Sequence, residues 1–342
     1  MAKENTSRET SIDLIKFIAC VLIVVLHAIT PSENVIQETV YLLGSYGIPL
    51  FFMVNGYLRR DKQFTFGFAW KMTVRYVKFI AFWALLLGTA KLLLQREFVY
   101  PRLFAGAIIG FDSLYHLWFL TGLLILYYIL AVGSVFAVKR NTTINVLLKS
   151  KSAVIISLTL MSLSFLLNLF LKFQYGAEIR DFIHGPFRII TNGGYFLIGM
   201  NLGLREIECR NKNSLSLSLS LLLEILFFIT VIILSKITGI LWASSYYDFP
   251  GIIFGTVILF SIIQEKTSGK IPAKWLPFLG TSSGIWIFHP FVVKLLNKVY
   301  QYFFGTLTLP IRIGILIFTI FSCLLVTLLF EKNKYLRKLI RP

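Results

Sequence analysis

The stretch from Lys16 to His27, KFIACVLIVVLH, places ten apolar residues between a lysine and a histidine. An α-helix rises about 1.5 Å per residue, so this stretch spans about 16 Å and almost three whole turns. The two ionisable side chains therefore share one helix face at very different depths. Ionisable groups in a membrane helix are costly, and they usually mark functional positions. The stretch predicts a membrane-spanning helix with a cation at one end and a functional imidazole near the other.

Similar apolar blocks recur along the 342 residues, of which 56% are hydrophobic and 15% charged. Each block is close to the ~20 residues that a helix needs to cross a bilayer, and none shows the ten-residue alternation of an outer-membrane barrel. The sequence predicts an all-α polytopic integral membrane protein of about ten transmembrane helices. Because the connections are short, we expect one membrane-embedded domain over residues 1–342 and no separate soluble domain. The predicted spans are 12–30, 36–58, 74–94, 115–138, 153–172, 189–204, 214–234, 249–263, 276–296 and 310–330.

The net charge of +18 comes from 34 Lys and Arg residues against 16 Asp and Glu. With the N-terminus in the cytoplasm, well over half of these cations fall in cytoplasmic segments, as the positive-inside rule requires. We therefore expect both termini in the cytoplasm and contacts with membrane lipids, and no nucleic-acid partner. The three cysteines indicate neither a disulfide framework nor a metal site. The oligomeric state is left open.

The histidines are informative because there are only four. His116 begins the predicted fourth span, and His289 lies about thirteen residues into an outward-running helix, ~20 Å from its inner end. Three histidines are thus expected at one depth, with His27. The alternative places His27 between helices without a function, and His116 and Trp118 in an interfacial aromatic belt. His184 is expected in an outer loop.

Two acidic residues lie in predicted spans. Asp13 is one turn before Lys16, and we expect the two to form an ion pair. The alternative for Lys16 is that its side chain extends to the lipid headgroups. Glu224 is placed in the middle of the predicted seventh span, where it is protonated, paired or turned toward a cavity.

Three motifs occur in order: IDLIKFIACVLIVVLH, then GIPLFFMVNGYL, then YHLWFL. Together they resemble acyltransferase family 3, multi-spanning membrane O-acyltransferases of which many acetylate bacterial surface polysaccharides. Lys16 and His27 match the family's first-helix motif, a basic residue, ten residues and a histidine. Asp13 matches the acidic residue that precedes it, and Asn55 stands where the family often has serine. The stretch WKMTVRYVKFIAFW resembles the family's basic third-helix entrance, which usually has more arginines.

The resemblance implies acyl transfer from a cytoplasmic acyl-coenzyme A to a sugar hydroxyl, with His27 as the catalytic base. His116 is expected to orient the acceptor or His27, with His289 a weaker candidate for either role. The phosphates of coenzyme A are expected to bind cations at the inner mouth: Lys16, Arg75, Lys71 and Lys78. Direct transfer and a transient acyl-histidine both remain open.

These features lead to one prediction with two alternatives. We predict an O-acetyltransferase of the bacterial cytoplasmic (inner) membrane that uses acetyl-coenzyme A as a substrate and binds no cofactor. Its acceptor is a lipid-linked oligosaccharide or surface glycan, such as an O-antigen unit. The alternatives are a glycan exporter or flippase, and an acyltransferase with a small cytoplasmic acceptor. Transport does not require a path from a cation to a histidine, which favours the enzyme.

Overall fold

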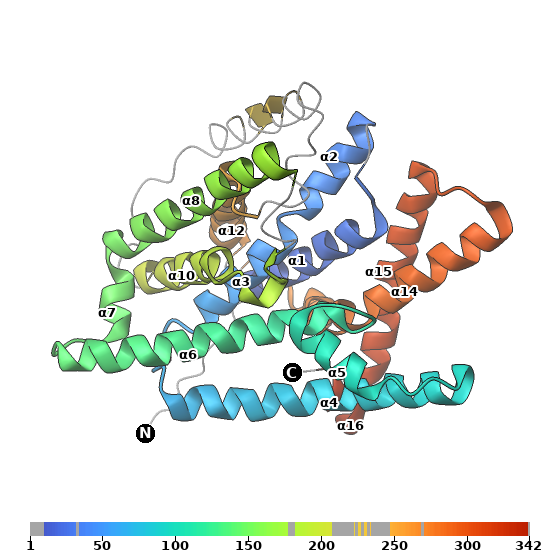
Figure 1. Ribbon diagram of the computed structural model, residues 1–342, viewed down its shortest axis with the longest axis horizontal. Helices are drawn as coiled ribbons and strands as arrows, with labels where there is room; N and C mark the ends of the chain where they lie inside the picture. The colour runs from blue at the N-terminus through green and yellow to red at the C-terminus, as the bar shows by residue number, and fades with distance from the viewer. Residues whose placement is uncertain are drawn as a thin grey trace.

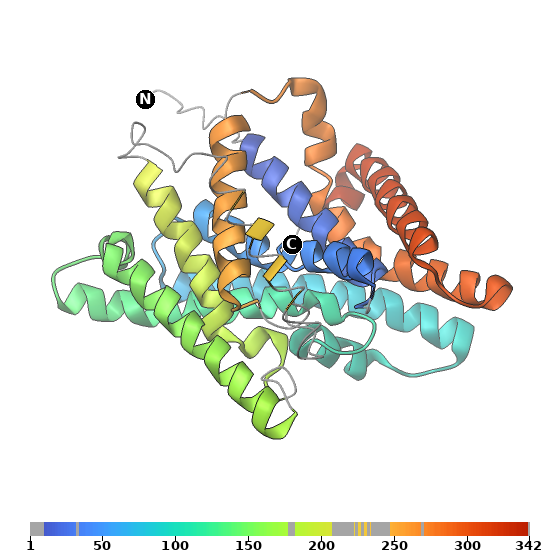
Figure 2. The same cartoon turned by 90° about the horizontal axis from the view of Figure 1, so that it is seen from above.

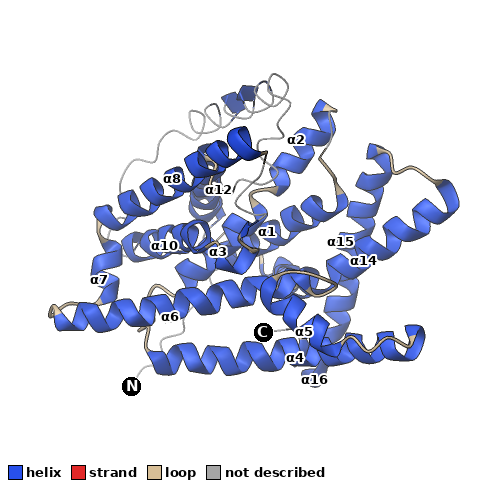
Figure 3. Cartoon of the chain, in the orientation of Figure 1, coloured by secondary structure: helices blue, strands red, loops and turns tan. Residues whose placement is uncertain are grey.

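The structure is a computed structural model that describes residues 10–31, 34–176, 182–206, 247–267 and 270–340, with a few single positions between 222 and 233. Every regular element in these parts is helical (Figure 3). Among the described residues, five helices are long and apolar enough to cross a membrane: α1 (Thr10–Ala28), α4 (Phe66–Gln95), η1 with α6 (Tyr115–Lys139), α8 (Lys151–Tyr175) and α15 (Leu309–Lys332). All five coincide with predicted spans, which supports a polytopic membrane protein.

Two of the predicted spans are broken helices. The span 36–58 consists of α2 (Val35–Gly44) and α3 (Gly47–Leu58). Pro49 lacks the N–H that would bond the carbonyl of Ser45, and its ring crowds that carbonyl, so the break falls there. The span 276–296 consists of α13 (Leu276–Leu279) and α14 (Ser282–Phe304).

Two of the remaining predicted spans are helices in the structure, and a third is largely not described. The span 189–204 corresponds to α10 (Ile189–Glu206), and 249–263 to α12 (Pro250–Thr267). Most of the predicted seventh span, 214–234, lies outside the described residues, and so does Glu224. Shorter helices that were not predicted are α5 (Tyr100–Ile109), α7 (Ile144–Lys149), α16 (Lys334–Leu339), η2 (Gly185–Phe187) and η3 (Ala273–Trp275).

Helix α1 lies at the centre of the bundle. It packs against α2, α3, α12, α14 and α15. Figure 2 shows it between α12 on one side and the α14–α15 hairpin on the other. In Figure 1, α4 and α6 run side by side along the lower edge, and α8 lies beside α10. This arrangement surrounds the C-terminal end of α1, which carries His27, with side chains from distant parts of the chain.

Helices α3 and α10 cross with their backbones in contact. A Cβ atom added to Gly56 would lie 1.9 Å from the carbonyl oxygen of Phe196, and one on Gly199 would lie 2.0 Å from that of Met53. Only glycine permits this approach, which is typical of helices packed through small residues in membranes. The crossing fixes the position of α3, which packs against α1.

We expect Gly199→Ala to destabilise the protein by about 1–3 kcal/mol, because the added methyl group must push the two helices apart. Thermal unfolding in detergent measures the effect. Gly314→Ala on α15 is the matched control, since nothing lies within 4 Å of its added Cβ. Equal melting temperatures for the two variants would contradict the close crossing.

Candidate active site

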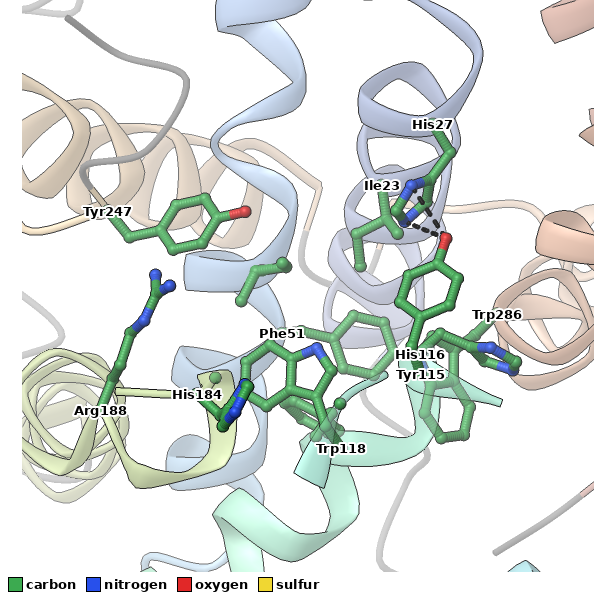
Figure 4. Close-up of a pocket in the computed structure, with 14 residues that line it drawn as sticks. Ile23, His27, Phe51, Tyr115, His116, Trp118, His184, Arg188, Tyr247 and Trp286 are labelled. Carbon is green, nitrogen blue, oxygen red and sulfur yellow. Dashed lines mark hydrogen bonds between the residues drawn. The ribbon is translucent and has the colours of Figure 1, made fainter. Parts of the chain in front are cut away.

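A cavity of about 360 Å³ lies beside the C-terminal end of α1 (Figure 4). His27 of α1, Tyr115 and His116 of η1, and His184 and Arg188 around η2 reach it from three parts of the chain. Aromatic side chains form much of the remaining wall: Phe51, Trp118, Phe119, Tyr247 and Trp286. Polar groups are thus gathered in a mainly aromatic chamber, which is the usual composition of a small-molecule site.

His27 is paired with Tyr115 at the wall of this cavity. The Tyr115 hydroxyl oxygen lies 3.1 Å from Nδ1 of His27 and 3.4 Å from Nε2. The two rings meet edge to face, with their centroids 5.4 Å apart. In a neutral imidazole, one nitrogen carries a hydrogen and the other a lone pair. A hydrogen bond between Nδ1–H and the Tyr115 oxygen leaves the lone pair of Nε2 able to accept a proton.

His289 stacks on the ring of His27. Its ring centroid is 5.2 Å from that of His27, with the planes 26° apart, and 6.1 Å from that of His116. Its Nδ1 lies 2.9 Å from the carbonyl oxygen of Ile285, to which it donates. The side chain is fully buried and is not part of the wall of the 360 Å³ cavity. His289 therefore contacts the site through His27.

His116 lines the cavity and is only 4% exposed. Neither of its ring nitrogens has a hydrogen-bond partner among the described residues. Buried polar atoms are nearly always satisfied, so this ring is suited to bond a group that enters the cavity. The structure thus brings together the three histidines expected at one depth, and Trp118 lies with them in the cavity wall.

The loop before η1 fixes the position of Tyr115 and His116. Asp112 adopts a φ of +58° and pairs with Arg102 at 2.8 Å and Lys91 at 3.9 Å. Ser113 donates to the same carboxylate from its backbone N–H and its hydroxyl. Burial favours the neutral acid, but the Ser113 hydrogen bonds and the two cations hold the pKa of Asp112 below its usual range. A charged, well-bonded loop therefore supports the segment of η1 that carries Tyr115 and His116.

The residues expected to bind the donor lie away from this cavity. Nζ of Lys16 is 3.3 Å from Oδ1 of Asp13, which confirms the predicted ion pair. The other three cations are on α4: Lys71, Arg75 and Lys78. They lie on the exposed side of that helix, opposite a buried stripe of Met72, Tyr76 and Phe79. None of the four cations lines the 360 Å³ cavity.

The structure also shows which cavity residues the sequence failed to indicate, and what the predicted site residue Asn55 contacts. The amide of Asn55 donates to the carbonyl of Phe51 one turn earlier, at 2.9 Å, and is thus occupied within α3. Tyr115 was not singled out, although it stands beside His116 in YHLWFL. His184, expected in an outer loop, also lines the cavity. Arg188 and Tyr247 carry no local signal, because only folding brings them to the cavity that His27 also lines.

A model of the acyltransferase domain of family 3 matches residues 9–328. This range covers most of the chain and includes every residue named above for the site. A search of curated proteins and a search of solved structures each returned no match. The length of the family match shows that the chain belongs to acyltransferase family 3 and is an acyltransferase.

Proposed function

We propose that this acyltransferase moves an acetyl group from acetyl-coenzyme A to a hydroxyl of a lipid-linked or surface glycan. The observation that carries the proposal is the Tyr115–His27 pair at the wall of a cavity rich in aromatic residues. A polar pair of this kind supplies a base, and aromatic faces suit the apolar face of a sugar ring. His116, whose ring nitrogens have no hydrogen-bond partner among the described residues, is suited to hold the acceptor hydroxyl.

The reaction needs a group that removes a proton as the acceptor oxygen attacks the thioester. Nε2 of His27 takes the hydroxyl proton while the oxygen bonds to the carbonyl carbon. The carbon–sulfur bond then breaks, and the proton passes from His27 to the leaving thiolate, giving an ester and free coenzyme A. Tyr115 holds the imidazole in the required tautomer, and His289 limits its rotation by stacking.

We place this reaction in one membrane-embedded domain of a bacterial inner-membrane protein with both termini in the cytoplasm. Lys16, with Arg75 and its neighbours on α4, then lies at the inner mouth, where phosphates of coenzyme A are attracted to cations. The arm of coenzyme A is long enough to reach from there toward His27. This orientation follows from the distribution of Lys and Arg along the chain.

Labelled acetyl-coenzyme A, purified protein and a lipid-linked oligosaccharide provide the direct test. We expect label in the glycan, and in cells a surface polysaccharide heavier by one acetyl group. Label in a small cytoplasmic molecule instead would favour an acyltransferase with a small cytoplasmic acceptor. Glycan export without any acylation would favour a transporter and contradict the proposal.

Tyr115→Phe tests the role of the pair, because it removes only the hydroxyl that contacts His27. A hydrogen bond to a group that becomes charged contributes about 1.5–3 kcal/mol, so kcat should fall about 10- to 150-fold. The KM for acetyl-coenzyme A and the melting temperature should be unchanged. Tyr100→Phe is the control, since its hydroxyl also contacts a side chain, Thr89 at 3.1 Å, outside the cavity. Similar kcat values for both variants would remove Tyr115 from the mechanism.

A further inference from the structure

His27 and Tyr115 also line a second cavity, of about 410 Å³. Its other walls come from α14, from the start of α15 and from the segment that joins them. Three cations line this second cavity, Lys294 and Lys298 one turn apart on α14 and Arg312 on α15. No Asp or Glu is among its lining residues in the described part of the chain. The candidate base thus separates an aromatic chamber from a cationic one.

The cationic cavity is built into the end of α1. The guanidinium of Arg312 donates to the carbonyl oxygen of Ala28, which follows His27, at 3.4 Å. It also donates from Nε to the carbonyl of Leu307 at 3.3 Å. These contacts hold a positive charge close to the base. Lys294 and Lys298 form no ion pair with a described residue, so their charges are available to a ligand.

The same cavity offers amide groups besides its cations. Asn297 and Gln301 line it, and the buried Oδ1 of Asn297 has no hydrogen-bond partner among the described residues. An unpaired buried acceptor is costly, and a hydroxyl donor from a ligand removes that cost. Cations together with amides match a ligand that carries both an anionic group and hydroxyls. An acidic sugar has this chemistry.

The location of these cations supports a role in binding the acceptor. In the proposed orientation they lie at the outer end of α14 and α15, where the positive-inside rule disfavours Lys and Arg. The Lys16 end of α1, proposed to bind the donor phosphates, is about 16 Å away along the helix. Donor and acceptor anions would therefore bind at opposite ends of α1, with His27 near the acceptor.

We propose that the cationic cavity binds a carboxylate- or phosphate-bearing sugar of the acceptor, so that the glycan acylated by this enzyme is acidic. This inference rests on the proposed function, because it names the acceptor of the same site. The anionic group binds Lys294, Lys298 and Arg312, and a hydroxyl of the neighbouring sugar, which lies in the aromatic cavity, reaches His27.

The test measures the binding of two trisaccharides to the protein in phosphatidylcholine nanodiscs: trigalacturonate, which is acidic, and maltotriose, which is neutral. We expect tighter binding of trigalacturonate, and weaker binding as salt is added. Because the two lysines are exposed, each contributes modestly, and the double variant Lys294→Gln/Lys298→Gln should weaken trigalacturonate binding about tenfold. Arg96→Gln, an exposed cation at the end of α4, is the control and should bind like wild type.

Several results would overturn the inference. Equal affinity for the two trisaccharides is one, and unchanged binding in the double variant is another. If the two lysines matter only when phosphatidylglycerol is added to the nanodiscs, the cavity binds lipid headgroups. If the double variant binds coenzyme A more weakly, the cavity binds the donor. Transfer from labelled acetyl-coenzyme A is measured on the same samples. Wild-type protein that binds trigalacturonate but acylates no glycan contradicts the proposed function and leaves the acidic-sugar site standing.

Discussion

His27→Ala is expected to lower acyl transfer by about 100- to 10,000-fold, the usual cost of removing a general base. The imidazole lies at the wall between two cavities, bonded to Tyr115 and stacked on His289. Alanine removes the only part of the side chain that can accept a proton. The variant should still enter the membrane, because α1 remains apolar from Phe17 to Leu26. Turnover of labelled acetyl-coenzyme A by purified variant and wild type measures the loss.

His184→Ala is the matched control for this experiment. His184 lines the same 360 Å³ cavity but is exposed, and it lies in the segment before η2 rather than on α1. Losing this imidazole should change turnover far less than losing His27. Near-normal activity of His27→Ala would remove His27 from the chemistry, and equal losses in both variants would point to a general effect on the cavity.

Lys16→Gln is expected to weaken the binding of acetyl-coenzyme A about 10- to 150-fold, if Lys16 contacts a phosphate. A charge-assisted hydrogen bond contributes ~1.5–3 kcal/mol, and 1.4 kcal/mol corresponds to a factor of ten. The KM for the acceptor should change little, because the acceptor binds at the other end of α1. Lys16→Arg should retain more affinity than Lys16→Gln, since it keeps the charge.

The ion pair with Asp13 dictates the design of this test. Asp13 is only 8% exposed, so removing Lys16 alone takes a paired cation away from a buried carboxylate and threatens folding. The double variant Asp13→Asn/Lys16→Gln removes both charges of the ion pair together. Lys151→Gln, an exposed lysine at the start of α8, controls for the loss of one positive charge. A double variant with normal donor affinity would show that Lys16 serves only the ion pair.

The features that the sequence determined by itself are local ones. Apolar blocks of sufficient length predict membrane helices one at a time, because the bilayer requires each segment to satisfy its own backbone. The spacing of Lys16 and His27 and the two motifs that follow it indicated the family, and the family match agrees. The Asp13–Lys16 pair is also local, since one helical turn sets it. Helix breaks such as Ser45–Tyr46 were missed because apolar length hides them.

The environment of His27 was decided only by the tertiary structure. Its partner Tyr115 is 88 residues away, and Arg312, bonded to the end of α1, is 284 residues from Ala28. Neither contact follows from composition or periodicity, because both depend on how α1 crosses η1, α14 and α15. The helical period predicted a common level for the three histidines but not which side chains each of them faces. Packing of distant helices around α1, rather than any one segment, created the two cavities that meet at His27.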